Sequence, residues 1–185
     1  METALLLIDI QNDYFPGGKN PLEGSLEASL QAKAAVEYFR THKLPVVHVQ
    51  HISTRTGATF FLPNTPGAEI HDNVRPLPGE TVIQKHYPNS FRETALLDCL
   101  RKEGVTRLVI CGMMTHMCVQ AGTRAAADLG FECTVLSDAC ATKALTFEGK
   151  VTPAEQVHAS SLAALAAAYA KVMKVDELLT KIGKG

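Results

Sequence analysis

The segment Ala4-Leu5-Leu6-Leu7-Ile8 is a run of five apolar residues that ends directly at a carboxylate, Asp9. The run is too short to cross a bilayer, and it lacks the basic flank and the cleavage site of a signal peptide. Continuous apolar runs of this length are typical of strands that helices cover on both faces of a parallel sheet. We therefore predict a core strand at 4–8, with Asp9 at its carboxyl end.

Similar runs recur along the chain and alternate with helical patterns. The other predicted strands are 45–52, 81–84, 107–111, 133–136 and a weaker 171–175, and the predicted helices are 26–41, 90–104, 117–129 and 152–168. Capping boxes are expected at Ser90-Phe91-Arg92-Glu93 and at Thr152-Pro153-Ala154-Glu155, where a hydroxyl residue precedes a glutamate by three positions. The alternation predicts an α/β fold, a three-layer α/β/α sandwich with a mostly parallel, doubly wound sheet.

Composition fits one globular domain over 1–185, because 46% of the 185 residues are hydrophobic and 20% are charged. The formal net charge is −1 and no Lys/Arg cluster stands out, so we expect neither a nucleic-acid nor a membrane partner. The five cysteines form no C-x-x-C pair. This pattern favours reduced thiols and a cytoplasmic location over a disulfide framework.

Reactive side chains follow three of the predicted strands. Asp9 follows the first, Lys85 follows 81–84, and Cys118 lies on the first turn of the helix after 107–111. Ligands bind beyond the carboxyl ends of the strands in open α/β sheets, so the three are expected to meet there. The helix N-terminus and the Lys85 ammonium would favour a thiolate at Cys118, while Asp9 is placed to take the thiol proton and later return it to a leaving group.

The turn before Cys118 supplies candidates for an oxyanion hole. The backbone N–H groups of Met114 and Cys118 would bind the oxyanion of a tetrahedral intermediate, and Gly112 allows the sharp turn. These residues predict nucleophilic acyl transfer through a thioester.

Three sequence motifs occur along the chain in an order that is typical of one protein family. They are Asp9-Ile10-Gln11-Asn12-Asp13-Tyr14, then Lys85 with Ser90-Phe91 a few residues on, and then Gly112-Met113-Met114-Thr115-His116-Met117-Cys118-Val119. Together they resemble the motifs of the isochorismatase-like cysteine hydrolases, and the resemblance extends over nearly the whole chain.

The resemblance implies a parallel-sheet α/β/α fold, a homo-oligomer (dimer or tetramer) and hydrolysis of small non-peptide amides or related groups. By match of position, it makes Asp9 the general base, Lys85 the charge stabiliser and Cys118 the nucleophile. It also implies a cis peptide between Met113 and Met114 that directs an N–H at the oxyanion.

Two departures narrow this interpretation. Nicotinamidase-type members carry a metal-binding Asp-x-His after the second strand, but here the stretch is Val49-Gln50-His51-Ile52-Ser53, with no matching carboxylate. We expect no metal and no organic cofactor, and metal binding by His48, His51 or His71 is left open. Members that cleave the vinyl ether of isochorismate can lack the cysteine, so Cys118 favours thiol chemistry on a C–N bond.

Side chains in the loops after the strands are candidates for substrate contact. The aromatic residues there are Tyr14, Phe15, Phe60, Phe61 and Tyr87. Phe15, Phe60 and Tyr87 are expected to contact a small planar substrate. Gln11 is a further candidate, with a second role in holding Asp9 and the first loop. The long segment 53–78, which has four prolines and no clear period, is expected to form a pocket wall.

The sequence therefore predicts a cysteine-dependent hydrolase of a C–N bond in a small non-peptide amide, carbamoyl or imide-like compound. A vinyl-ether hydrolase working through Asp9 and a nicotinamidase- or pyrazinamidase-like amidase are the enzyme alternatives. A binding or redox-sensing protein that keeps the scaffold without catalysis is the third. Substrate identity, oligomer size and completion of the pocket by a neighbouring subunit are left open.

Overall fold

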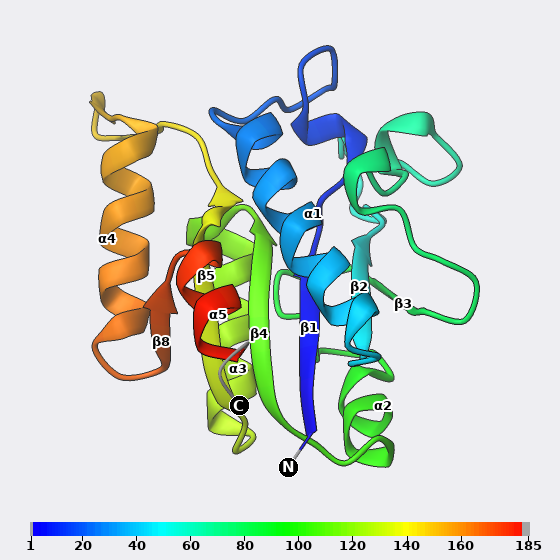
Figure 1. Cartoon of the computed structure of the whole chain (residues 1–185). Coiled ribbons are helices and arrows are strands. Elements are labelled where there is room, and N and C mark those ends of the chain that lie inside the picture. The colour runs from blue at the N-terminus through cyan, green and yellow to red at the C-terminus, as the bar shows by residue number, and fades with distance from the viewer. Residues whose placement is uncertain (1, 183–185) are drawn as a thin grey trace.

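The computed structural model describes residues 2–182, and six of its strands form one parallel sheet (Figure 1). The strands are β1 (Glu2–Ile8), β2 (Val46–His51), β3 (Thr81–Lys85), β4 (Val105–Met113), β5 (Glu132–Ala141) and β8 (Ala170–Met173). Their order is β3-β2-β1-β4-β5-β8, and every neighbouring pair is parallel. The six predicted strands are confirmed, although β4 and β5 are longer than expected. Of the domain predicted over 1–185, residues 1 and 183–185 lie outside the described residues.

Helices cover both faces of this sheet. α1 (Ser25–Thr41) and α5 (Val175–Ile182) contact each other on one face (Figure 1). α2 (Leu96–Lys102), α3 (Gln120–Asp128) and α4 (Ala154–Ala166) cover the other. With helices on both sides, the middle of the central strands is buried, and the side chains from Ala4 to Ile8 are at most 2% exposed. The predicted three-layer α/β/α sandwich is confirmed.

The order of the strands reverses between β1 and β4. From β1 the chain proceeds to β2 and β3 on one side, and then returns to β4, β5 and β8 on the other. At such a reversal the connecting segments leave the sheet toward opposite faces, so a crevice opens beyond the carboxyl ends of the strands. The loops that follow β1 and β2 rise from this edge, at the top of Figure 1. The topology therefore places a ligand site at the ends of β1 and β4.

Gly112 lets β1 and β4 approach each other at the start of this crevice. It pairs with Ile8 and has a φ of 134°, a conformation that residues with side chains rarely adopt. A Cβ at this position would overlap the carbonyl oxygen of Ile8. Only glycine therefore allows β4 to continue into the turn that follows.

Both predicted capping boxes are wrong. α2 begins at Leu96 rather than at Ser90, and the Ser90 hydroxyl is buried without a hydrogen-bond partner in the described part of the chain. Ser90 instead packs against Gly122 of α3. Thr152 ends a strand, and α4 follows Pro153 without a side-chain cap. In both places tertiary packing and strand pairing override the local signal.

Two elements near the C-terminus differ from the prediction. β6 (Leu145–Phe147) and β7 (Lys150–Thr152) form an antiparallel hairpin that was not predicted. Both hairpin strands are exposed, so they carry no alternation of buried and exposed residues that would mark them. Val175, predicted as the end of a strand, is the buried first residue of α5.

The segment 53–78 contains no long element, as expected, and folds back over the loop after β1. It includes two short 3-10 turns, Pro66–Ala68 and Asp72–Val74. Ile70 pairs with Gln11 in an isolated bridge, which ties the two loops together at the crevice. The segment is therefore placed to form one side of a pocket.

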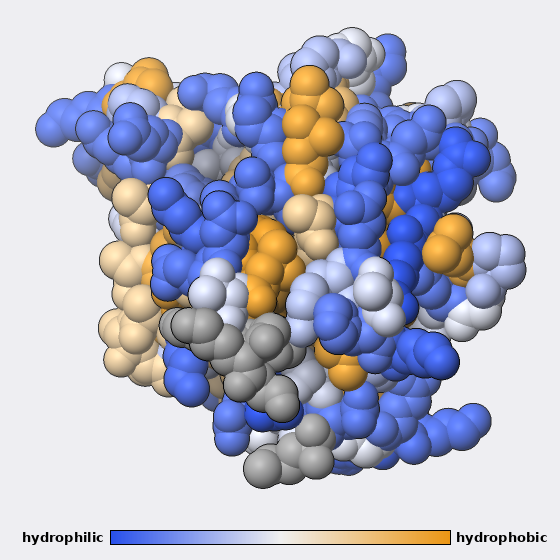
Figure 2. All heavy atoms as spheres, in the orientation of Figure 1, coloured by the Kyte–Doolittle hydropathy of each residue, from blue (hydrophilic) through white to orange (hydrophobic). Residues whose placement is uncertain are grey.

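The face of the molecule that carries α1 is largely hydrophilic, with paler apolar surface over α4 at the left (Figure 2). The most exposed large apolar side chains belong to the hairpin, with Phe147 77% and Val151 66% exposed. None of the helices within residues 2–182 combines the length and the apolarity that crossing a bilayer requires.

Candidate active site

Asp9 stands at the centre of the crevice, directly after β1, and is fully buried. Its φ of 52° is left-handed, a region that aspartate enters more readily than most residues. Oδ2 accepts a hydrogen bond from Lys85, whereas Oδ1 has no partner among the described residues. A buried carboxylate oxygen without a partner carries a desolvation cost. Oδ1 is therefore free to accept a proton from a neighbouring group.

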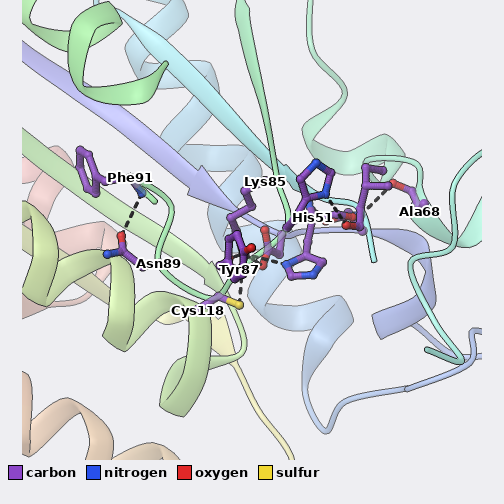
Figure 3. A network of polar contacts seen from close by, with 11 residues as sticks. His51, Ala68, Lys85, Tyr87, Asn89, Phe91 and Cys118 are labelled. Atoms are coloured by element: carbon purple, nitrogen blue, oxygen red, sulfur yellow. Dashed lines mark hydrogen bonds and ion pairs between the residues drawn. The ribbon is translucent and has the colours of Figure 1, made fainter. Parts of the chain in front are cut away.

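Lys85 is the last residue of β3 and reaches across the end of β2 to the other site residues (Figure 3). Its Nζ lies 2.7 Å from Oδ2 of Asp9 and 3.3 Å from Sγ of Cys118. Nδ1 of His51 and the carbonyl oxygen of Tyr87 each lie 3.1 Å away. Four acceptors thus surround a group with three protons, which fixes the ammonium in place.

Cys118 lies in a π-helical turn, Thr115–Val119, between β4 and α3. The prediction had placed it on the first turn of an α-helix beginning at 117, but α3 begins only at Gln120. Thr115 anchors the turn through a hydrogen bond of 2.9 Å between its Oγ1 and Nδ1 of His158 on α4. The Cys118 side chain is 5% exposed, so very little of it reaches solvent.

The electrostatics of the resting site differ from the expectation at Cys118. Burial, together with the neighbouring Asp9 carboxylate, raises the pKa of the Cys118 thiol, and the opposing effect of Lys85 is smaller. The predicted thiolate is therefore wrong for the site without substrate, where the sulfur is protonated. Burial alone would lower the pKa of Lys85, but Asp9 and Cys118 raise it above its usual value, so the amine is an ammonium.

The resting trio is thus a neutral thiol beside an ion pair. One oxygen of Asp9 and Sγ of Cys118 lie within 4.8 Å of each other. Proton transfer from sulfur to this carboxylate would leave a thiolate that the ammonium of Lys85 stabilises at 3.3 Å. The arrangement can therefore form the Cys118 thiolate during attack on the substrate, although the resting site holds a neutral thiol.

The peptide bond between Met113 and Met114 is cis, at the junction of β4 and the π-helical turn. Met113 is fully buried and Met114 is 7% exposed. The two residues named for an oxyanion hole, Met114 and Cys118, therefore flank one short turn at the carboxyl end of β4.

The Gln11 side chain is bound to the main chain of two neighbouring segments. Its amide is fully buried and binds only main-chain groups: Nε2 donates to the carbonyl oxygens of His51 and Ala68, and Oε1 accepts from the His51 N–H. The expected substrate contact at Gln11 stays a prediction, and in this structure its amide is engaged by the main chain. The second role named for it, holding the first loop, matches these bonds.

Asp13 holds the aromatic side of the site. Its Oδ2 accepts from the N–H of Phe61 at 2.7 Å, and its Oδ1 accepts from the N–H of Lys19. Phe61 is buried with a φ of 55°, an uncommon conformation for a large side chain. The Phe61 ring contacts those of Tyr14 and Phe60, with centroids 4.6 and 4.9 Å from its own. These three rings form the aromatic wall of the site.

The other aromatic candidates take different positions. Phe15 is buried and stacks on His71, with ring centroids 3.7 Å apart, beside a cavity of about 530 Å³ between the loop after β1 and the segment 53–78. Tyr87 offers its carbonyl oxygen to Lys85, while the Arg92 guanidinium lies over its ring at 3.6 Å. The structure thus brings Phe60 to the wall formed with Phe61, and it does not bring Phe15 or Tyr87 into that wall.

His51 is the site residue that the sequence left without a role. It is the last residue of β2, directly between the ends of β1 and β3. The predicted strand ran to 52, so it placed His51 inside the strand and not at its end. Burial lowers its pKa to about 4, with Lys85 and His86 adding to the effect and Asp9 opposing it. The imidazole is therefore neutral. With the strand ends as the structure has them, Asp9 directly follows β1 while His51 and Lys85 end β2 and β3, so the same edge of the sheet carries all three.

Asp9, His51 and Cys118 each offer one ligand atom, and these atoms lie within 4.8 Å of one another. The ammonium of Lys85 lies 2.7 to 3.3 Å from the same three side chains, so the chain's own cation fills the middle of this set. His48 faces away from the set and contacts Glu80 at 3.0 Å, while His71 stacks on Phe15.

Comparison with known proteins connects this geometry to a family. The model of the isochorismatase domain matches residues 3–177. An uncharacterized isochorismatase family protein of Bacillus subtilis, YddQ, is 52% identical, over 97% of this chain and 99% of its own length. A crystal structure described as a putative isochorismatase hydrolase from Oleispira antarctica is 52% identical, with a TM-score of 0.93 and coverage of 97% of this chain and 96% of that one. Nicotinamidase 3 of Arabidopsis thaliana is 29% identical, over 95% of this chain and 86% of its own length.

Proposed function

The chain belongs to the isochorismatase family of hydrolases, and from that premise we propose that it hydrolyses a C–N bond in a small non-peptide amide, carbamoyl or imide-like compound. The observation that carries the proposal is the position of Nζ of Lys85, between the carboxylate of Asp9 and the sulfur of Cys118. Three residues more than thirty positions apart converge on one buried point. A neighbouring acid, cation and thiol are what covalent acyl transfer needs.

The first half of the reaction forms a thioester. Sγ of Cys118 attacks the substrate carbonyl while its proton moves to Asp9. The backbone N–H groups of Met114 and Cys118 bind the oxyanion, and the ammonium of Lys85 offsets the charge on sulfur. Asp9 then gives the proton to the departing nitrogen, so that the C–N bond breaks and an amine or ammonia leaves.

The second half returns the enzyme to its starting state. Asp9, now ionised again, takes a proton from a water molecule, which attacks the thioester carbonyl. The C–S bond breaks, sulfur recovers the proton, and the product leaves as an acid. Atoms balance with one water consumed, and no oxidant or organic cofactor takes part.

The alternatives receive less support from the site. A vinyl-ether hydrolase working through Asp9 alone has no use for a thiol at 3.3 Å from the lysine. Nicotinamide hydrolysis has a relative in its favour, the Arabidopsis nicotinamidase. However, the carboxylate expected for a pyridine-binding metal after β2 is absent from 49–53, and His51 there contacts Lys85 instead.

Admission of substrate requires movement at the aromatic wall. Asp9 and Lys85 are 0% exposed and Cys118 is 5% exposed. Phe61, which is 1% exposed, makes edge-to-face contacts with Tyr14 and Phe60, and its ring centroid lies 5.9 Å from that of His51 in the site. We propose that the segment carrying Phe60 and Phe61 opens to admit the substrate, because Phe61 borders His51 at the site.

The experiment is a panel of small amides, ureides and imides assayed for release of ammonia or amine by the wild-type protein and three variants. Cys118→Ala and Cys118→Ser are each expected to lose at least about 10³-fold in kcat, as for a removed nucleophile. Cys99→Ser, a half-buried cysteine on α2, is the control and should keep full activity. Near-normal turnover by Cys118→Ala would refute the thioester and favour chemistry through Asp9 alone.

The expected homo-oligomer stays a prediction, as do the small-molecule substrate and the absence of nucleic-acid partners. Light scattering of the purified protein is the direct measurement of oligomer size. Exposed apolar side chains on the hairpin, Phe147 above all, are the first place to substitute if an assembly is found.

A further inference from the structure

A side chain from another segment holds the backbone of His51 in addition to the pairing of the strands. The N–H and the carbonyl oxygen of His51 both bond to the side-chain amide of Gln11, at 2.7 and 2.9 Å. That amide also donates to the carbonyl of Ala68 in the segment 53–78. The fully buried side chain of Gln11 therefore fixes the backbone of His51 at the opening of the crevice.

The proton of the His51 imidazole is assigned by its neighbour. Lys85 has only protons to offer, so Nδ1, 3.1 Å from Nζ, must be the acceptor. Because the ring is neutral, Nε2 carries the N–H. Figure 3 shows the ring turned so that one nitrogen points at Lys85 and the other points away from it. Nε2 has no hydrogen-bond partner among residues 2–182, and it is not one of the fully buried unpaired atoms.

The surroundings of this N–H are those of a recognition site. One nitrogen of the His51 ring lies within 4.8 Å of both the Asp9 carboxylate and the Cys118 sulfur. The two nitrogens share one small ring, so the Nε2–H is at most a ring's width further from these groups. The Phe61 ring lies on another side, with centroids 5.9 Å apart. A fixed donor beside an aromatic face and close to the nucleophile suits a hydrogen-bond acceptor on the substrate a few bonds from the scissile carbonyl.

We propose that His51 determines specificity, because its Nε2–H donates to a second carbonyl of the substrate. The preferred substrates are then amides that carry a second acceptor near the scissile bond, such as diamides, ureides and imides, rather than simple aliphatic amides. The proposal rests on the C–N hydrolysis argued above. It adds a residue and a substrate feature that the cysteine, aspartate and lysine do not supply.

His51 has two separable tasks, and two substitutions divide them. In His51→Asn, an amide oxygen near the former Nδ1 can still accept from Lys85, but the donor at Nε2 is lost. In His51→Gln, the longer amide can place an N–H near the former Nε2, but the acceptor for Lys85 is lost. His42→Asn is the matched control, since His42 follows the far end of α1 and its side chain contacts Tyr38, through Nδ1 to the carbonyl and by stacking on the ring.

The test compares kcat and KM for succinamide and butyramide, which share a primary amide and a four-carbon chain and differ in the second carbonyl. Wild type and His42→Asn should favour succinamide by at least about tenfold in kcat/KM, the effect of one well-formed hydrogen bond. His51→Asn should lose this preference, mainly through a higher KM for succinamide, so that its kcat/KM values for the two compounds become equal. His51→Gln should keep the preference while kcat falls on both compounds.

A merely structural role for His51 would lower activity on both compounds to the same degree in both variants, and that result would overturn the proposal. So would equal use of succinamide and butyramide by the wild-type protein. If neither is turned over but another member of the amide panel is, this inference fails while the proposed function stands. If no C–N compound is turned over, both fail.

Discussion

Replacing Lys85 with methionine tests the buried ion pair on which the site is built. Lys85 and Asp9 are both 0% exposed, and the charged atoms are 2.7 Å apart. At an effective dielectric constant of about 20, their attraction is worth about 6 kcal/mol, most of which offsets the loss of hydration. Removing one partner leaves an uncompensated buried charge, which typically costs about 3–5 kcal/mol.

In Lys85→Met the free energy of unfolding should therefore fall by about 3–5 kcal/mol. For a chain of 185 residues this lowers Tm by about 6–20 °C. Urea denaturation of the wild type, Lys85→Met, Asp9→Asn and the double variant gives a double-mutant cycle. Because the two groups share one interaction, the double variant should be more stable than the sum of the single effects predicts, by about 3 kcal/mol.

The control is Lys33→Met. Lys33 is half exposed and pairs with Glu37 at 3.9 Å on the surface of α1, so its loss should cost less than about 1 kcal/mol. Strictly additive effects of Lys85→Met and Asp9→Asn would refute the reasoning, since they would mean that the two charges do not depend on each other.

Three further predictions concern the frame around the site. Gly112→Ala should abolish or severely reduce folded protein, because a Cβ would overlap the Ile8 carbonyl at a φ of 134°; the soluble yield and circular dichroism report it. Glu80 has a pKa lowered to about 2, since its bonds to Arg40, the Leu77 N–H and His48 outweigh burial. It therefore stabilises the fold above about pH 4.5, and this stabilisation is lost as the pH falls toward 2. The shift corresponds to about 3 kcal/mol, which solvent screening at this partly exposed carboxylate reduces to about 2 kcal/mol. Urea titrations at pH 7 and pH 3 should show a smaller loss on acidification in Glu80→Gln than in wild type, and an equal loss would contradict the assignment. Asp13→Asn removes the charged acceptor for the Phe61 N–H and should raise KM several-fold with a smaller change in kcat, whereas an unchanged KM would count against the aromatic wall.

The strands and the meeting of Asp9, Lys85 and Cys118 at one edge of the sheet could be predicted because each depends on a strong local signal. The apolar run at 4–8 has few alternatives to a buried strand, and the ends of parallel strands necessarily meet at one edge of the sheet. That reasoning was enough to bring Asp9, Lys85 and Cys118 together across more than a hundred residues.

The errors arose where long-range contacts outweigh local signals. The capping pattern at Ser90 gives way to packing against Gly122, and the hairpin at 145–152 has no buried face to give a period. The charge state of Cys118 depends on how deeply the loops bury it, and sequence spacing does not report that depth. The main-chain partners of Gln11, in His51 and Ala68, lie 40 and 57 residues away, so the sequence does not indicate them.

The central claim is that the sulfur of Cys118 becomes covalently attached to the acyl part of the substrate. The most direct measurement is mass spectrometry of the intact protein and its peptides after a reaction with the best amide of the panel is stopped with acid within milliseconds. The account predicts an added mass equal to the acyl group, on the peptide that contains Cys118 and absent from Cys118→Ala. Steady turnover with that peptide unmodified at every time point would contradict it.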